Sequence, residues 1–160
     1  MDRRIAAFAV DFGTASLFSS VGGQGLLIPL FILTWLGLRV VWVEKNRGQS
    51  LGRWLFDIKV ADFRLGSTPG LQALFQRESM AGIAALFLLI GLVNLSPTNG
   101  FILIAPIPLL ADCSYALTDS EYRQAFHDRI ARTLMVQTRR GYSLDLKLKK
   151  LFAQASRRVK

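Results

Sequence analysis

Three charged residues stand at the edges of long apolar segments, and their types could do chemistry in apolar surroundings. Asp11 comes directly before the uncharged stretch Phe12–Leu38, and Arg39 follows it. Asp112 comes directly after a second uncharged stretch, Ser79–Ala111. Two carboxylates near one guanidinium could bind a cation, or exchange a proton if one carboxyl is protonated near neutral pH. The alternative is a buried ion-pair network that only fixes which helices pack together.

The elements that must position these charges are predicted to be transmembrane helices. A helix needs roughly 20 mostly apolar residues to cross the ~30 Å hydrocarbon core of a bilayer. Each apolar region is long enough for two short helices, with turn residues at Ser20–Gly25 and at Asn94–Gly100. Pro106 and Pro108 would kink the last span. We therefore predict two helical hairpins, with spans at about residues 5–21, 26–43, 79–95 and 101–117.

The distribution of basic residues predicts the orientation of these spans. The chain has 20 Lys and Arg, a formal net charge of +9 and 51% hydrophobic residues. Every Lys and Arg lies outside the two uncharged stretches, and the predicted outer turns carry no charge. The positive-inside rule then places both termini and the central loop, residues 44–78, in the cytoplasm. The expected location is a bacterial inner (plasma) membrane or a thylakoid membrane.

This orientation predicts a similar depth for the three charged residues. Asp11, Arg39 and Asp112 would all lie in the cytoplasmic half of the bilayer. An unpaired charge there is costly, so we expect the three to meet in the bundle interior as an intramembrane charge cluster. Arg4 and Arg77, at the cytoplasmic edge, could extend their long side chains toward the same cluster.

The cytoplasmic segments are predicted to form a small β-ribbon and amphipathic surface helices. Apolar residues alternate with others over residues 56–61, as in a half-buried strand. A Thr-Pro pair at residues 68–69 would begin a short surface helix that runs toward Arg77. A capping-box spacing at Thr118–Glu121 would begin another helix that runs through Leu134. The predicted fold class is therefore an all-α membrane protein with a small cytoplasmic β-ribbon.

The chain divides into a membrane domain, residues 1–137, and a basic amphipathic tail, residues 138–160. Residues 139–160 hold eight Lys or Arg and one acid, and apolar residues recur there at helical spacing. Such a helix would lie on an anionic leaflet or against an acidic partner. The alternative is a solvated tail without a partner. The residues expected to dock a partner or lipid are Lys147, Lys149, Lys150, Arg157 and Arg158.

Four short motifs follow one another along the chain: Arg4–Asp11, Gly48–Asp62, Arg77 and His127–Val136. In these motifs the chain resembles the RDD family of small multi-pass membrane proteins. The resemblance covers about residues 3–137, and it implies a multi-pass helical membrane domain. It leaves the activity open, because some members are linked to cation transport and others look like accessory subunits of larger membrane complexes.

Four residues of these motifs would lie at the cytoplasmic edge of the membrane: Arg4, Arg77, His127 and Asp128. The His-Asp pair could tie a surface helix to the central loop, for instance through Arg53 or Arg77. His127 is the only histidine, so we predict no catalytic residues, no metal site and no cofactor. Topology and the tail account for the positive charge, so nucleic acid is not an expected partner.

Two functions remain open from the sequence. The first is a non-enzymatic accessory or assembly subunit that docks a larger membrane protein complex through its spans and basic tail. The second is a small cation or proton transporter that acts as a homo-oligomer through Asp11 and Asp112. The expected partners are a larger membrane protein complex or further copies of the chain, together with anionic lipid at the cytoplasmic face.

Overall fold

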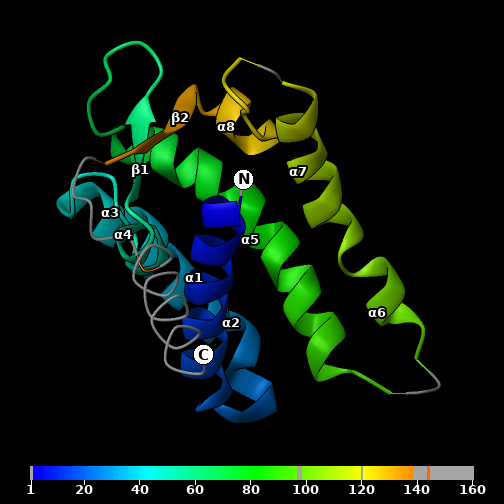
Figure 1. Ribbon diagram of the computed structural model, residues 1–160. Helices are drawn as coiled ribbons and strands as arrows, with labels where there is room; N and C mark the ends of the chain where they lie inside the picture. Colours follow the sequence, from blue (N-terminus) through cyan, green and yellow to red (C-terminus); the bar gives the residue numbers. More distant parts are fainter. Residues whose placement is uncertain (1, 97–98, 120, 139–143, 145–160) are drawn as a thin grey trace, which may run out of the picture.

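The computed structural model shows a mostly helical protein with a small two-stranded sheet (Figure 1). It describes residues 2–96, 99–119, 121–138 and 144. The first elements are a helical hairpin and its continuation: α1 Asp2–Ser20, α2 Gly23–Leu36, η1 Gly37–Val41 and α3 Trp42–Lys45. The next elements are α4 Leu51–Leu55, β1 Ile58–Asp62 and α5 Leu71–Val93. The later elements are α6 Phe101–Ile104, α7 Ile107–Thr118, α8 Phe126–Ile130 and β2 Thr133–Gln137.

Helices α1 and α2 form a hairpin that turns just before Gly23. A glycine suits this place because its φ is 69°, a conformation that other residues rarely adopt. Aromatic rings fill the space between the two helices. Phe31 packs against Trp35 and Phe12, with ring centroids 5.6 Å and 6.0 Å apart. Trp35 and Phe31 are both about 1% exposed, so the hairpin has its own apolar core.

Helix α2 continues through one π-helical turn, η1, into α3. The N–H of Trp42 donates to the carbonyl of Gly37, five residues back, so this turn holds one residue more than an α-helical turn. Arg39 lies in this turn and is only 5% exposed. The wide turn therefore carries a charged side chain on the inner face of an apolar helix.

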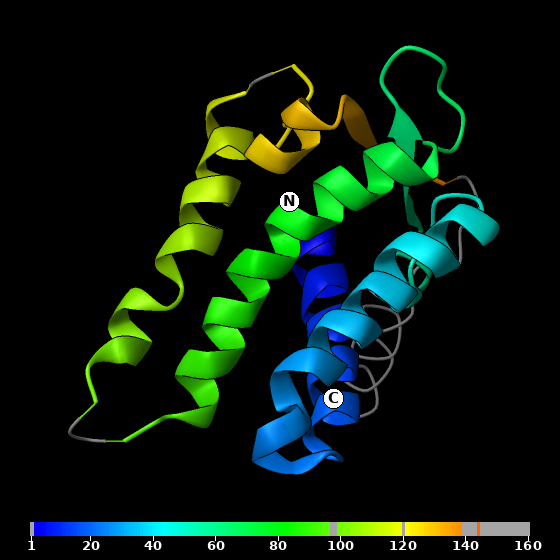
Figure 2. The same ribbon diagram turned by 180° about the vertical axis from the view of Figure 1, so that it is seen from behind.

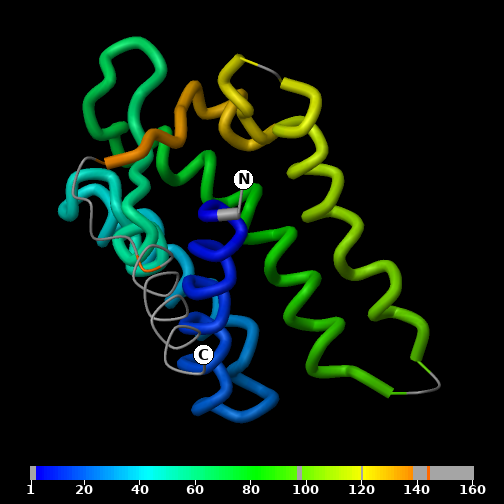
Figure 3. The backbone as a smooth tube through the Cα atoms, viewed as in Figure 1, coloured from blue at the N-terminus to red at the C-terminus, as the bar shows by residue number. Residues whose placement is uncertain are grey.

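Helix α5 lies between the α1–α2 hairpin and the segment Phe101–Thr118, which comprises α6 and α7 and is called the arm below (Figure 2). The arm bends at Pro106, between α6 and α7, in agreement with the kink that the prolines predict. It lies close to α5 at Gly91, where an added Cβ would lie 2.6 Å from that of Ala105. The turn after α1 and the end of α5 lie at the same end of the molecule, opposite the sheet (Figure 3).

The sheet joins two segments that are far apart in the sequence. Strands β1 and β2 run antiparallel, with Ile58 opposite Gln137 and Asp62 opposite Thr133. Val60, in the middle of β1, is fully buried and its side chain packs with Val43 and Leu74. The sheet therefore fastens the end of the described chain to the segment that follows α4, and it confirms the predicted β-ribbon.

Three helical segments of the described chain are long and apolar enough to cross a membrane: Gly23–Lys45, Leu71–Val93 and Phe101–Thr118. Helix α1 is not among them, although it has 19 residues. Its sequence includes the charged residues Arg3, Arg4 and Asp11. The prediction of a helical membrane protein is thus supported by three spans, and the fourth is considered below.

Two predicted surface helices are wrong in their boundaries. The segment expected as a short helix before Arg77 belongs to α5, which runs without a break from Leu71 to Val93 and has Gly70, not Thr68, as its N-cap. The helix expected from Thr118 to Leu134 does not form. Residues 126–130 make the short helix α8, and Thr133–Gln137 pair with β1 as a strand. Tertiary pairing with β1 outweighs the local helical spacing of the apolar residues there.

Candidate functional site

Glu78 lies at the centre of a buried network of charged side chains. Its carboxylate is fully buried near the start of α5. Arg39 donates from Nε to Oε2 at 2.6 Å, and Arg53 donates from Nη2 to Oε1 at 2.5 Å. Arg77 donates from Nη1 to the same Oε1. Three guanidinium groups, from η1, α4 and α5, therefore converge on one carboxylate.

Asp11 forms the second centre, on α1. Its carboxylate accepts hydrogen bonds from the Ser50 hydroxyl at 2.6 Å, from the Gly52 backbone N–H at 2.7 Å and from Arg39 at 3.3 Å. Ser50 is also the N-cap of α4, where its hydroxyl accepts from the Arg53 N–H at 3.3 Å. One buried carboxylate thus holds α1, η1 and the start of α4 together.

The backbone of α4 lies against α1 at Gly52. An added Cβ there would clash with the carbonyl oxygen of Ala7 and would lie 3.0 Å from Oδ1 of Asp11. This close approach explains why a glycine stands at the first turn of α4. The absence of a side chain lets the Gly52 N–H reach the carboxylate of Asp11.

Asp128 forms the third centre, at the end of the molecule that holds the sheet. Its Oδ1 accepts from Arg77 Nε at 2.6 Å and from the Thr133 hydroxyl at 3.3 Å. Burial opposes ionisation of Asp128, but the charge and hydrogen bond of Arg77 outweigh it and hold the pKa below its usual value. This carboxylate stays ionised and links α5 to α8 and β2.

The three acids and three arginines of this network, called the buried charge network below, balance in charge. They are Asp11, Glu78 and Asp128 with Arg39, Arg53 and Arg77. The Arg39 guanidinium also lies over the Trp35 ring, 4.6 Å from its centroid. Burial lowers the pKa of Arg53 to about 10, so Arg53 stays positively charged near neutral pH.

A separate hydrogen-bonded pair, Asp112 and His127, joins the arm to α8. Oδ2 of Asp112 lies 2.5 Å from Nδ1 of His127, and Oδ1 accepts from the His127 backbone N–H at 2.9 Å. The other ring nitrogen of His127 lies 3.5 Å from Asp128. Both side chains of the Asp112–His127 pair are 12% exposed, so this pair is closer to solvent than the buried charge network.

The predicted cluster is therefore brought together only in part. Asp11 and Arg39 meet, as expected for two charges at similar depth. Asp112 lies on the arm, across α5 from α1, and pairs with His127 instead (Figures 1 and 2). Depth along the membrane normal brings charges together only where their helices are neighbours, and α1 and α7 are not neighbours.

The predicted edge residues have partners of their own. Asp128 contacts Arg77, one of the two partners expected for the His-Asp pair. Arg4 donates to the backbone carbonyls of Arg123 at 2.5 Å and Met135 at 3.2 Å, beside the sheet. The tail lysines and arginines expected to dock a partner or lipid lie outside the described residues.

Sequence reasoning missed Glu78 and Ser50 as members of the site, and it named Arg53 only as a possible partner of the His-Asp pair, whereas Arg53 pairs with Glu78. The available signal was the pair Arg77-Glu78 directly before the second uncharged stretch. A carboxylate at that border would be expected to lie near the other charges at the same depth. Arg53 and Ser50 lie in the central loop, away from the borders of the uncharged stretches, so predicted depth gave no signal that they join Glu78 and Asp11.

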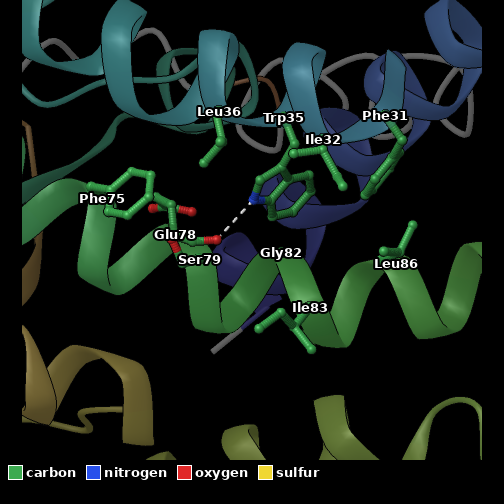
Figure 4. Close-up of a pocket in the computed structure, with 10 residues that line it drawn as sticks. All are labelled: Phe31, Ile32, Trp35, Leu36, Phe75, Glu78, Ser79, Gly82, Ile83 and Leu86. Carbon is green, nitrogen blue, oxygen red and sulfur yellow. Dashed lines mark hydrogen bonds between the residues drawn. The ribbon is translucent and has the colours of Figure 1, made fainter. Parts of the chain in front are cut away.

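An apolar groove lies between α2 and α5, beside Glu78 (Figure 4). Its volume is about 250 Å³, and Trp35 lines it together with Gly82. The indole N–H of Trp35 donates to the backbone carbonyl of Glu78 at 3.0 Å. An added Cβ at Gly82 would lie 2.8 Å from the Trp35 indole nitrogen, so the glycine allows the ring to lie flat against α5.

The arrangement suits holding helices together. Asp11 and Glu78 each accept three hydrogen bonds, and they share Arg39 as a donor. Within the described residues, no three His, Cys, Asp or Glu side chains lie close enough to hold a metal ion. Nη1 of Arg53 is buried and has no hydrogen-bond partner among the described residues.

The fold and the buried charges define a class first: a helical membrane protein whose apolar helices are joined by internal ion pairs. The family follows from the comparison with known sequences. The model of the RDD family matches residues 1–132, most of the chain, and the chain belongs to this family of membrane proteins. Searches of curated proteins and of solved structures each found no significant match.

Proposed function

We propose that this protein is a non-enzymatic accessory or assembly subunit that binds a larger membrane protein complex. The observation that supports this best is the state of the arm. Only 11% of the arm is buried, against 39% for the span in α5. Leu103 and Leu110 on the arm are 78% and 63% exposed. Such an apolar helix, attached along one side only, offers a surface on which helices of other membrane proteins can pack.

The proposed membrane arrangement has four spans in two hairpins, with α1 as the fourth span. Its 19 residues would extend roughly 28 Å at 1.5 Å per residue, close to the thickness of the hydrocarbon core. Asp11 does not forbid this, because Arg39 neutralises it. The sheet and α8 would lie in the cytoplasm with both termini, since both outer turns are uncharged. The proposed membrane is a bacterial inner membrane or a thylakoid membrane.

The buried charge network would act as a scaffold within this arrangement. Lipid gives helices no hydrophobic reason to associate, so packing and polar contacts must hold them together. The network joins α1, η1, α4, α5 and α8 through paired charges. These pairs support a structural role for Asp11 and Arg39 over a transport site. The basic tail, with Lys147 and its neighbours, would add contacts to acidic partners or anionic lipid.

One observation favours the rival, a homo-oligomeric cation or proton transporter. The Asp112–His127 pair is partly exposed and joins two groups that can exchange protons. In this function Asp11 and Asp112 would lie along the path of the ion. The two functions differ in what a neutral side chain at Asp11 would do.

Gentle detergent extraction of the tagged full chain, followed by native sizing and mass spectrometry, tests the accessory function. We expect a large assembly with other membrane proteins. Replacing both Leu103 and Leu110 with Ser, or removing residues 139–160, should release the partners. Leu65→Ser, which changes an equally exposed leucine on the sheet end, is the matched control and should retain them. A uniform small homo-oligomer without partners would contradict the proposal.

Asp11→Asn separates the rival from the accessory function. If Asp11 is structural, the variant should be less abundant in membranes and melt at a lower temperature in detergent, because Arg39 and two other donors lose their charged acceptor. If Asp11 carries an ion, the variant should insert and fold normally but lose ion flux in proteoliposomes. Asp112→Asn is the companion variant for the arm.

A further inference from the structure

A hollow lined by arginines lies at the end of the molecule that holds the sheet. It lies between the loop after β1 and the connection from α8 to β2. Its volume is about 300 Å³, at the lower end of the range for small-molecule sites. The residues that line it are Phe63, Arg64, Gln124, Arg129 and Arg132.

The backbone holds these lining residues in fixed relative positions. The Phe63 N–H donates to the carbonyl of Arg132 at 2.9 Å, so the loop after β1 is tied to the α8–β2 connection. The Arg132 N–H donates to the carbonyl of Arg129 at 3.2 Å. The buried Gln124 side chain donates to the carbonyl of Thr133 at 2.9 Å. The hollow is therefore built by backbone contacts between separate segments.

The arginines of the hollow differ from those of the buried charge network. Among the described residues, the guanidinium groups of Arg64, Arg129 and Arg132 have no ion pair and no hydrogen bond, and all three side chains are exposed. Three like charges around one hollow repel one another, so an anion there would relieve the repulsion. In contrast, each arginine of the buried charge network has a carboxylate partner.

Two acidic side chains interact electrostatically with these arginines but do not line the hollow. Asp62 interacts with Arg64, and Asp119 interacts with Arg129. Asp62 accepts hydrogen bonds from the backbone N–H groups of Arg64 and Leu65, at 2.8 and 3.0 Å. Asp119 accepts from three backbone N–H groups further along its own loop. These hydrogen bonds from backbone N–H groups lower the pKa of both carboxyls. Both carboxylates therefore stabilise the conformation of their own loops.

We propose that this hollow binds a phosphate group, carried either by a soluble phosphate compound or by a lipid headgroup. Guanidinium groups match phosphate oxygens in charge and in geometry, because each can donate two parallel hydrogen bonds. Phe63 is 44% exposed and packs edge-on against Tyr122, with ring centroids 5.4 Å apart. This ring gives the hollow one apolar wall, against which the organic part of the ligand would lie.

The site is independent of the accessory function and of the basic tail. Its residues lie on the loop after β1, just before α8, on α8 and on the connection from α8 to β2, all outside the spanning segments. In the proposed orientation it faces the cytoplasm, where both anionic lipid headgroups and soluble phosphates occur. Both sources share the same phosphate chemistry, so the experiment must distinguish them.

The first experiment measures binding of inorganic phosphate to the full chain in detergent, by calorimetry and by thermal shift. Sodium chloride at equal ionic strength is the reference. Arg132→Gln and Arg64→Gln should each weaken binding about tenfold, the loss expected for one hydrogen bond to a charged group. Arg47→Gln is the matched control, because Arg47 is exposed, lies outside the hollow and has φ of 52°, against 50° for Arg132.

The second experiment measures binding of the full chain to vesicles of phosphatidylcholine, with and without phosphatidylglycerol. Phosphate binding that Arg132→Gln weakens, with no effect of the variant on vesicle binding, would identify a soluble phosphate compound as the ligand. A variant effect on the phosphatidylglycerol vesicles would identify a lipid headgroup. Circular dichroism and native sizing confirm that the variants are folded, and Arg64→Gln on an exposed loop remains informative if Arg132→Gln does not fold.

Two results would overturn the proposal. The first is equal loss of binding in Arg47→Gln and Arg132→Gln, since this would mean a diffuse charge effect. The second is an absence of binding to both inorganic phosphate and phosphatidylglycerol in the folded wild-type chain.

Discussion

Two helical regions of the molecule are held in place in different ways. The first is the α1–α2 hairpin together with α5, and the second is the arm. Within an apolar 18-residue stretch of each of the spans Gly23–Lys45 and Leu71–Val93, 28% and 39% of the residues are buried, and the buried charge network joins the hairpin to α5. The arm is 11% buried. It contacts α5 at Gly91 and is tied to α8 by Asp112 at its other end. The paired charges thus coincide with the helices that are locked together.

This difference follows from the physics of helices in lipid. Apolar side chains gain little by leaving lipid for the protein interior, so an apolar face alone does not select a partner helix. A buried charge does select one, because it must find its counter-charge. Glu78 supplies that selection for α5, η1 and α4, whereas the described part of the arm has one such charge, Asp112, near its junction with α8.

Glu78→Gln should have the largest effect on this comparison. Removing the charge leaves Arg39, Arg53 and Arg77 facing one another without their shared carboxylate. Breaking a buried ion pair from one side costs about 3–5 kcal/mol. We expect little folded protein in membranes, measured by immunoblot, and a large loss of thermal stability in detergent. Glu44→Gln, at an exposed site on α3, is the control, and equal stability of the two variants would contradict a central role for Glu78.

Gly52→Ala should have the next largest effect, through packing alone. The added methyl group would meet the carbonyl oxygen of Ala7 and push α4 away from α1. Overpacking of this kind costs about 1–3 kcal/mol. Gly13→Ala adds the same group on α1 where nothing lies within 4 Å, and we expect it to be neutral or slightly stabilising. Thermal unfolding of the pair would show whether contact at Gly52 is essential.

Asp128, at the end of the molecule that holds the sheet, should make the stability of the folded protein depend on pH. Its pKa is lowered in the folded protein, so the unfolded chain takes up the proton first as the pH falls. The stabilisation is complete above the ordinary pKa of 3.8 and is lost as the pH falls through the lower folded value. The melting temperature of wild type should therefore exceed that of Asp128→Asn at neutral pH, and the gap should narrow in acid. A gap that stays constant down to strongly acidic pH would show that Asp128 does not act through its charge.

Leu110→Ala in the arm should have the smallest effect on stability. Leu110 is 63% exposed, so the expected change is below about 0.5 kcal/mol in detergent. Leu89→Ala on α5 is the reference variant. Leu89 is 4% exposed in the core, so truncating its side chain should lower the free energy of unfolding by about 2–5 kcal/mol. Similar melting temperatures for the two variants would mean that the arm is not the loosely held part.

The sequence predicts the tightly held region better than the details that organise it. The meeting of Asp11 with Arg39 could be expected, because both flank one uncharged stretch and are predicted to lie at a similar depth. The separation of Asp112 could not be expected, since depth does not say which helices are neighbours. Glu78 lies one residue before an uncharged stretch, and its central place depends on α5 continuing through that border without a break.

Strand β2, at the end of the molecule that holds the sheet, also could not be predicted from the local sequence. Residues 126–134 have apolar side chains at helical spacing, but Thr133–Gln137 pair with β1. The partner strand is more than 70 residues earlier in the chain, so no local pattern indicates the pairing. The same distance in sequence hides the arginine hollow, which forms only when the loop after β1 meets the α8–β2 connection.

The π-helical turn at Gly37–Val41 makes this part of the chain tolerant of a change in length. The extra residue is accommodated inside the wide turn, so Trp42–Lys45 have nearly the rotation about the helix axis that an α-helical turn would give them. Deleting one residue of α2, where the turns are α-helical, would instead rotate Trp42–Lys45 by about 100°. Val43, now fully buried, would then turn away from its contacts with Val60 and Leu74. A deletion within the π-helical turn that spares Arg39 should therefore be tolerated better than a deletion in α2.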